Sequence, residues 1–207
     1  MKLDSRVQIG ERLEDHLSIE QRNILLDLRY LPWNGKKIKP GDRNVVQWDD
    51  RGKMPLTIST AWWVDDALAR TYSLVKNHFE RDNTKIKKVT FIQERKPPAY
   101  RGDEHDRNIA NTNAGVWHNH SGNSTKNTAI VVLDEVGGTE FMEGDLEVAD
   151  ESKITHEEVS KAVTSGTAQF KTLKAGHVGR FTDKTVHKRG EFESTEPRLV
   201  IVVEFED

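Results

Sequence analysis

The spacing of hydrophobic residues changes near residue 85, and the change predicts two kinds of structure in the chain. Residues 60–82 carry apolar side chains near the helical period, with acidic residues early and basic residues late, as the helix dipole favours. This pattern predicts an amphipathic helix that packs on a sheet. A shorter helix is expected after Ser18, which can cap it, with Ile24, Leu25 and Leu28 on one face.

Beyond residue 85 the hydrophobic residues follow the alternating period of strands, and glycine-containing turns separate the short runs. Many short strands joined by turns predict a closed β-barrel or a β-sandwich. Residues 152–163 predict a helix inserted between strands. The run from Leu199 to Val203 is continuously apolar, which is typical of a strand buried on both faces with a helix outside it. The predicted strands are 86–93, 115–120, 128–133, 139–142, 146–148, 168–173, 177–181 and 198–205.

The length and the order of these elements predict one domain over residues 1–207. Within it, residues 1–84 are expected to be a loop and helical support region, and residues 85–207 the β core. Residues 34–56 mix glycine and proline with charges, so they are expected to form loop with short strands at most.

Composition narrows the chemistry and the partners. The sequence has no cysteine, which excludes disulfides, thiol nucleophiles and cysteine metal sites. A formal charge of −3 leaves no basic footprint for nucleic acid, although lysine groups at 36–39 and 85–88 keep that partner open. No apolar run approaches the roughly 18 residues of a membrane span. Residues 1–10 have no apolar signal core. We therefore expect a cytoplasmic protein without membrane contact.

The strongest chemical signal is a set of three histidines. His118 and His120 stand two apart on a predicted strand, so their side chains point to the same face. His187 lies before the last strand and can close on the same point from inside a barrel. Three neutral imidazoles around one position suit a first-row transition metal.

Several segments, taken in order, resemble the iron(II)- and 2-oxoglutarate-dependent oxygenases. These are the His-x-His strand at 118–120, the apolar strand and Gly-Gly turn at 129–141, the Lys-Ala-Gly-His turn at 174–181, His187, and the Pro-Arg start of the last strand at 197–202. The resemblance covers under half of the chain. It implies a mainly β fold with flanking helices, the double-stranded β-helix, a jelly-roll or cupin-like barrel.

The resemblance also implies roles for particular residues. His118 and His187 correspond to the two histidines that bind Fe(II), and Arg198 to the arginine that pairs with the far carboxylate of 2-oxoglutarate. A guanidinium suits that task because it offers a planar fork and stays charged when buried. Trp117 and Arg189 are expected to line the substrate pocket. No catalytic side chain is expected beyond the metal ligands.

His120 stands where the oxygenases carry an aspartate, and this departure leaves alternatives. We assign His120 as the third ligand, as in the related three-histidine cupins, although the glutamate that cupins carry a few residues later is missing. A further alternative is that His120-Ser121-Gly122 resembles the His-x-Gly of iron halogenases, in which the missing carboxylate makes room for halide.

Three functions follow. The first is an Fe(II)- and 2-oxoglutarate-dependent oxygenase that oxidises, by hydroxylation, a small polar metabolite, an amino acid or a peptide side chain. The second is a three-histidine dioxygenase without 2-oxoglutarate, which would not need Arg198. The third is a barrel that has lost its metal and serves as a binding module. The sequence leaves the oligomeric state open.

Overall fold

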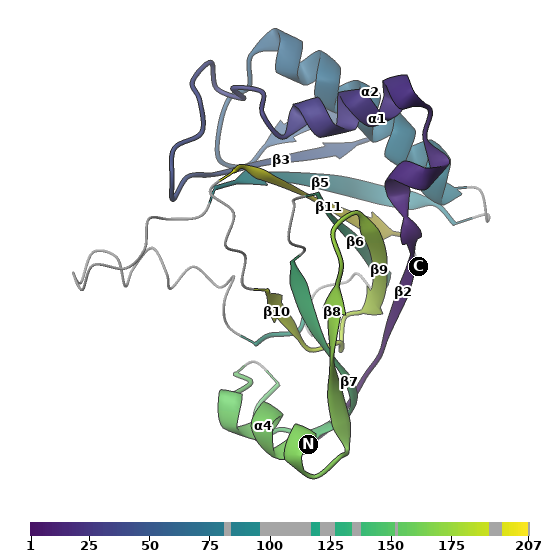
Figure 1. Ribbon diagram of the computed structural model, residues 1–207, viewed down its shortest axis with the longest axis vertical. Coiled ribbons are helices and arrows are strands. Elements are labelled where there is room, and N and C mark those ends of the chain that lie inside the picture. The colour runs from purple at the N-terminus through teal and green to yellow at the C-terminus, as the bar shows by residue number, and fades with distance from the viewer. Residues whose placement is uncertain are drawn as a thin grey trace.

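Two antiparallel sheets face one another in the computed structural model, which describes residues 1–80, 84–95, 117–120, 127–133, 138–151, 153–190 and 196–206 (Figure 1). The larger sheet has the strand order β2 (Val7–Arg12), β9 (His177–Thr182), β6 (Asn127–Leu133), β11 (Arg198–Phe205), β5 (Ile86–Glu94), β3 (Arg43–Asp49) and β4 (Gly52–Pro55). In the smaller sheet, β7 (Thr139–Glu147) pairs with β1 (Lys2–Ser5), β8 (Ala168–Leu173) and β10 (His187–Arg189).

Apolar side chains at alternate positions of the strands fill the space between the two sheets. Phe141 and Leu173 from the smaller sheet pack with Ile130, Phe181 and Val200 from the larger one. Successive side chains on a strand point to opposite faces, so every second side chain of each strand packs into this interior. The arrangement confirms the predicted mainly β, jelly-roll class of fold.

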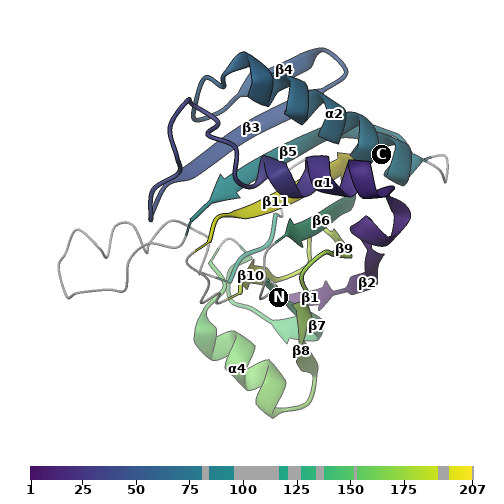
Figure 2. The same cartoon turned by 45° about the horizontal axis from the view of Figure 1, so that its top comes forward.

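Helices cover the outer face of the larger sheet (Figure 2). α2 (Trp62–Phe79) buries Val64, Leu68, Val75 and Phe79 against that face, which confirms the helix predicted over 60–82. α1 (Ile19–Leu28) packs beside it. The described residues also form η1 (Leu13–His16), near β2, and α4 (His156–Thr164), which packs against the smaller sheet.

The start of α1 follows from a reciprocal cap. The Ser18 hydroxyl accepts a hydrogen bond from the backbone N–H of Gln21, and the Gln21 side chain accepts one from the N–H of Ser18. This capping box satisfies donors that a helix start otherwise leaves open. Leu25 and Leu28 then point into the core, as the sequence predicted, while Ile24 is half-buried.

The last strand shows why its sequence is apolar throughout. Leu199, Ile201 and Val203 face the helices, and Val200 faces the other sheet. Both faces are therefore withdrawn from water, as predicted. The pairing of β11 with β5 on one side and β6 on the other places Arg198, its first residue, at the edge of the interior between the sheets.

Two sequence expectations are wrong. Residues 34–56 contain the strand β3 and the short strand β4, because β3 gains its partners from β5, more than forty positions along the chain. Residues 139–147 form one strand, β7, rather than the two predicted at 139–142 and 146–148, since Gly144 stays in the ladder at φ +125°. Strands β1 and β2 also join both sheets from a stretch that the sequence left without strands. The predicted strand at 115–120 and the Gly-Gly turn at 137–138 lie partly outside the described residues.

The described residues contain no helix that is both long enough and apolar enough to span a membrane.

Gly144 offers a test of the bent β7 strand. A Cβ at this position would lie 2.3 Å from the carbonyl oxygen of Thr167, in addition to the strain of a positive φ. We expect Gly144→Ala to lower the free energy of unfolding by about 2–5 kcal/mol, the sum of backbone strain and overpacking. Gly35→Ala is the matched control, because Gly35 also has a positive φ but open space around it. Its loss should be about 1–2 kcal/mol. Equal losses in urea titrations would contradict the close approach at Gly144.

Candidate metal centre

Backbone pairing between two distant segments creates the histidine cluster. The N–H of His118 donates to the carbonyl of His187 at 3.0 Å, and the N–H of His187 donates to the carbonyl of His118 at 2.9 Å. The N–H of His120 donates to the carbonyl of Asp183 at 2.8 Å. The chain at 118–120 is thus held beside β10 and its preceding turn, and His118 and His120 point to the same side.

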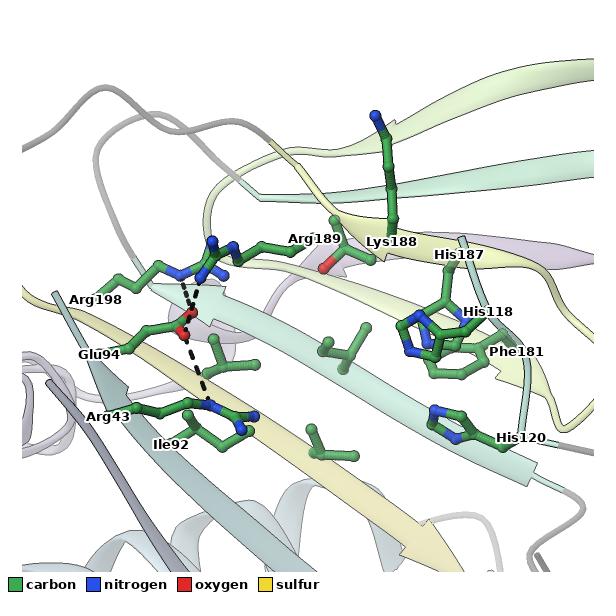
Figure 3. A pocket seen from close by; sticks show the side chains of 14 residues that line it. Arg43, Ile92, Glu94, His118, His120, Phe181, His187, Lys188, Arg189 and Arg198 are labelled. Atoms are coloured by element: carbon green, nitrogen blue, oxygen red, sulfur yellow. Dashed lines mark hydrogen bonds and ion pairs between the residues drawn. The ribbon is translucent and has the colours of Figure 1, made fainter. Parts of the chain in front are cut away.

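All three imidazoles converge on one place (Figure 3). The His118 and His187 ring centres are 4.4 Å apart, and those of His120 and His187 are 4.9 Å apart. One ligand nitrogen from each ring lies within 4.8 Å of the other two. Among the described residues, this is the cluster of potential metal ligands that the fold brings together. The structure therefore gathers the three histidines that the sequence singled out.

Burial keeps the cluster in the form that binds metals. Burial lowers the pKa of His187 to about 3, with His118 and His120 adding to the effect and the hydrogen bond to Thr185 opposing it. The pKa of His120 is lowered as well, mainly by burial and then by His118. His187 and His120 are consequently neutral at pH 7, and a neutral imidazole offers a lone pair to a metal.

The tautomer of His187 is fixed by its own loop. Its Nδ1 lies 2.9 Å from the carbonyl oxygen of Thr185. A carbonyl oxygen only accepts hydrogen bonds, so Nδ1 carries the hydrogen and Nε2 carries the lone pair. Metal-binding histidines usually have such a partner on the second nitrogen, which orients the ring.

Trp117 lies away from this cluster, contrary to its predicted place in the pocket. It is buried in a separate hydrophobic cluster with Met142, Leu146 and Val186, and it stacks with Phe170 at 5.7 Å. The reason is the same alternation that unites the histidines: if His118 and His120 face the interior, the residue before them faces outward.

The histidines form one end of a cavity of about 230 Å³ between the sheets. Apolar side chains form the middle of its wall, and a group of charged residues forms the other end (Figure 3). The apolar residues are Ile92, Ile130, Phe181, Val200 and Val202. Arg43, Glu94, Arg189 and Arg198 form the charged end, whereas Lys188 lies beside His187 and pairs with Glu140 at 3.0 Å. Among the described residues, three arginines and one carboxylate stand at the charged end, and this arrangement favours an anionic ligand.

Strand register brings three of these charges into one row. Glu94 on β5 is the cross-strand partner of Arg43 on β3 and of Arg198 on β11. The Arg198 Nε donates a hydrogen bond to Oε1 of Glu94, and both side chains are buried, with 3% and 6% of their surface exposed. Arg43 and Arg189 approach Oε2 of Glu94 at 3.8 and 3.6 Å.

This row changes how the burial of Arg198 is explained. A guanidinium buried without a counter-ion is costly, and that cost alone would imply a bound carboxylate. Glu94 supplies that counter-ion, so the burial of Arg198 does not by itself require a ligand. The case for an anionic ligand rests instead on the three guanidinium groups that gather around Glu94 at this end of the cavity.

Gly138 allows the Arg198 guanidinium to lie where it does. A Cβ on Gly138 would be 2.5 Å from Nη1 of Arg198 and 3.1 Å from the Val132 side chain. Gly190 packs against the same backbone, where a Cβ would lie 3.1 Å from the carbonyl carbon of Gly138. Position 138 therefore has no room for a side chain beside Arg198.

Sequence reasoning missed Arg43 and Glu94. Both stand at strand ends in stretches of mixed charge, and each becomes notable only when β3, β5 and β11 align in register. Arg189, predicted to line the pocket, does so from β10. The position of Glu94 at the end of an alternating strand was the available signal, but it carried no information about its partners.

Comparisons with known proteins support the fold. Models of protein families give no match to the sequence, and curated proteins give none either. Among solved structures, the chain is similar to the epimerase SnoN in complex with Fe3+, alpha ketoglutarate and nogalamycin RO. That alignment has a TM-score of 0.54 and 17% identity, and covers 99% of this chain and 80% of that one.

Two further solved structures are similar to this chain. A second structure of SnoN, described as a non-heme alpha ketoglutarate dependent epimerase from nogalamycin biosynthesis, has a TM-score of 0.52 at 17% identity, over 99% of this chain and 79% of that one. A prolyl-4-hydroxylase from Pseudomonas putida gives a TM-score of 0.44 at 13% identity, over 97% of this chain and 91% of that one. The two SnoN alignments establish that this chain has the double-stranded β-helix fold that its sequence resemblance predicted.

The residues present fit a metal ion of the kind this fold carries in SnoN. Three imidazole nitrogens suit divalent iron and neighbouring transition metals, and His120 and His187 stay neutral in the pH range of ordinary assays. The buried Nδ1 contact of His187 leaves Nε2 as its ligand atom. The charged end of the cavity fits a carboxylate.

Removing single histidines tests the cluster. We expect His118→Ala and His187→Ala to lower the content of bound Fe(II) or Co(II) from one ion per chain to a small fraction, because two imidazoles bind far more weakly than three. His120→Ala should behave in the same way. The measurement is equilibrium dialysis under anaerobic conditions.

His156→Ala is the matched control, since His156 is exposed on α4 and lies outside the cluster. Full metal content in His118→Ala and His187→Ala would rule out this centre. Full content in His120→Ala alone would reduce it to a two-histidine site formed by His118 and His187.

Proposed function

We propose that this protein is a non-haem iron enzyme that uses 2-oxoglutarate and O2 to hydroxylate a small polar metabolite, an amino acid or a peptide side chain. The observation that carries the proposal is the two-ended cavity. Neutral histidines that can hold Fe(II) form one end, and an arginine cluster suited to a carboxylate forms the other. The fold shared with SnoN, whose structure contains Fe3+ and alpha ketoglutarate, supports the same assignment.

The side chains have distinct tasks in this proposal. His118, His120 and His187 hold the iron, and the carbonyl of Thr185 keeps His187 oriented with Nε2 toward the ion. Arg198, braced through its Nε by Glu94, binds the far carboxylate of 2-oxoglutarate. When bound there, iron and 2-oxoglutarate would supply the activation of O2, coupled to loss of CO2. Ile130, Phe181 and other apolar wall residues keep bulk water from the reacting groups.

A third histidine in place of the usual aspartate alters the charge of the centre. Three neutral ligands leave Fe(II) with its full double positive charge, whereas an aspartate would reduce it by one. An anionic co-substrate is therefore more strongly attracted to this centre than to the usual one. This attraction supports a role for 2-oxoglutarate. The site does not need a further carboxylate from the protein to bind it.

The second candidate is a three-histidine dioxygenase that works without 2-oxoglutarate. Its specific support is the contact between Glu94 and Arg198, which satisfies the buried arginine without a ligand. The two candidates differ in one product. Iron-loaded protein supplied with 2-oxoglutarate and O2 forms succinate under the first, slowly even without the substrate, and forms none under the second.

Arg198→Lys tests the co-substrate assignment. Lysine keeps the charge but loses the planar fork, so 2-oxoglutarate should bind roughly tenfold or more weaker, in line with the ~1.5–3 kcal/mol of a charged hydrogen bond. Metal content should stay the same, because Arg198 is not a ligand. Titration calorimetry on anaerobic metal-loaded protein gives both values.

Arg70→Lys is the matched control, since Arg70 lies on the exposed face of α2 with Asp66 as its partner. If Arg198→Lys binds 2-oxoglutarate as tightly as the parent protein, the co-substrate does not use this arginine. Absence of binding in the parent protein favours the dioxygenase without 2-oxoglutarate.

A further inference from the structure

The row of Arg43, Glu94 and Arg198 runs from the buried interior to the surface. The exposed fraction of the side chains rises from 3% at Arg198 through 6% at Glu94 to 48% at Arg43. All three line the same cavity. Figure 3 shows the Arg43 side chain lying along the wall beside Ile92, below Glu94 and on the side of the cavity opposite Arg189. Arg43 therefore stands where the cavity meets solvent.

Glu94 interacts more closely with Arg198 than with Arg43. It accepts a hydrogen bond from Nε of Arg198, whereas Nε of Arg43 lies 3.8 Å from Oε2, too far for a hydrogen bond. Within the described part of the chain, that ion pair is the polar contact that the Arg43 guanidinium makes. Its planar donors are consequently available to a ligand that enters through the opening.

A ligand carboxylate cannot lie between Arg43 and Arg198, because the carboxylate of Glu94 already occupies that place and pairs with both. They stand two strands apart, which places their backbones roughly 10 Å from each other. The side chain of Glu94 lies between them and would repel an anion that tried to bridge the gap. A carboxylate held at Arg198 thus leaves Arg43 for a second anionic group.

We propose that Arg43 binds an anionic group of the substrate, a carboxylate or a phosphate on a small molecule, at the opening of the cavity. This inference rests on the proposed function, in which Arg198 holds 2-oxoglutarate. Arg43 is then a specificity-determining residue. It holds the charged end of the substrate at the opening, and the remainder extends along the apolar wall toward the histidines.

Binding of simple anions tests this role. The protein is loaded with Zn(II) in place of iron, so that no turnover occurs, and saturated with 2-oxoglutarate. Inorganic phosphate or acetate is then added in titration calorimetry. We expect one site with a dissociation constant in the millimolar range. Arg43→Gln should weaken it at least fivefold, Arg43→Lys should restore part of the affinity, and Arg70→Gln should leave it unchanged.

A parallel titration with 2-oxoglutarate separates the inference from the proposed function. Arg43→Gln should change the affinity for 2-oxoglutarate by less than threefold, whereas Arg198→Lys lowers it tenfold or more. An equal loss in both variants would assign Arg43 to the co-substrate and overturn the inference. Unchanged phosphate and acetate binding in Arg43→Gln would overturn it too. If the parent protein binds no 2-oxoglutarate, it is the proposed function that fails.

Discussion

Two backbone hydrogen bonds between His118 and His187 set the position of the histidine cluster, on which the proposed chemistry depends. They join a segment that precedes β6 to the start of β10, and they place the two imidazoles against each other in the interior between the sheets. Because side chains two apart share a face, His120 follows into the same space. The pairing also turns Trp117 outward into the packing around β7, which stabilises the same segment from its other side.

Burial and charge then divide the cavity into two unlike ends. At the histidine end, burial of His187 and His120 opposes protonation and leaves neutral ligands for a metal. At the other end, Glu94 makes the burial of Arg198 tolerable, because it pairs with the guanidinium inside the same row of strands. Apolar wall residues separate the two ends. A ligand with a metal-binding group at one end and a carboxylate at the other matches this arrangement.

The elements that could be predicted are those whose signal is local. The helix α2 and the strand β11 follow from hydrophobic spacing over many residues, and the three histidines follow from their spacing and order. The strand β3 could not be predicted in the same way, since its hydrophobic run is short and its stability comes from pairing with β5. The roles of Arg43 and Glu94 were hidden for a related reason, because register alone makes them neighbours. Trp117 was misplaced even though its signal is local, because the alternation that puts His118 and His120 on one face puts Trp117 on the other.

The central claim is that one cavity binds Fe(II) and 2-oxoglutarate together, with the histidines and Arg198 at its two ends. Its most direct test is an anaerobic titration of the Fe(II)-loaded protein with 2-oxoglutarate, followed by visible absorbance. The account predicts a charge-transfer band that grows to saturation at one equivalent of 2-oxoglutarate per iron, because the 2-oxo acid chelates the metal. A protein that holds one iron per chain but develops no band at saturating 2-oxoglutarate would contradict the account.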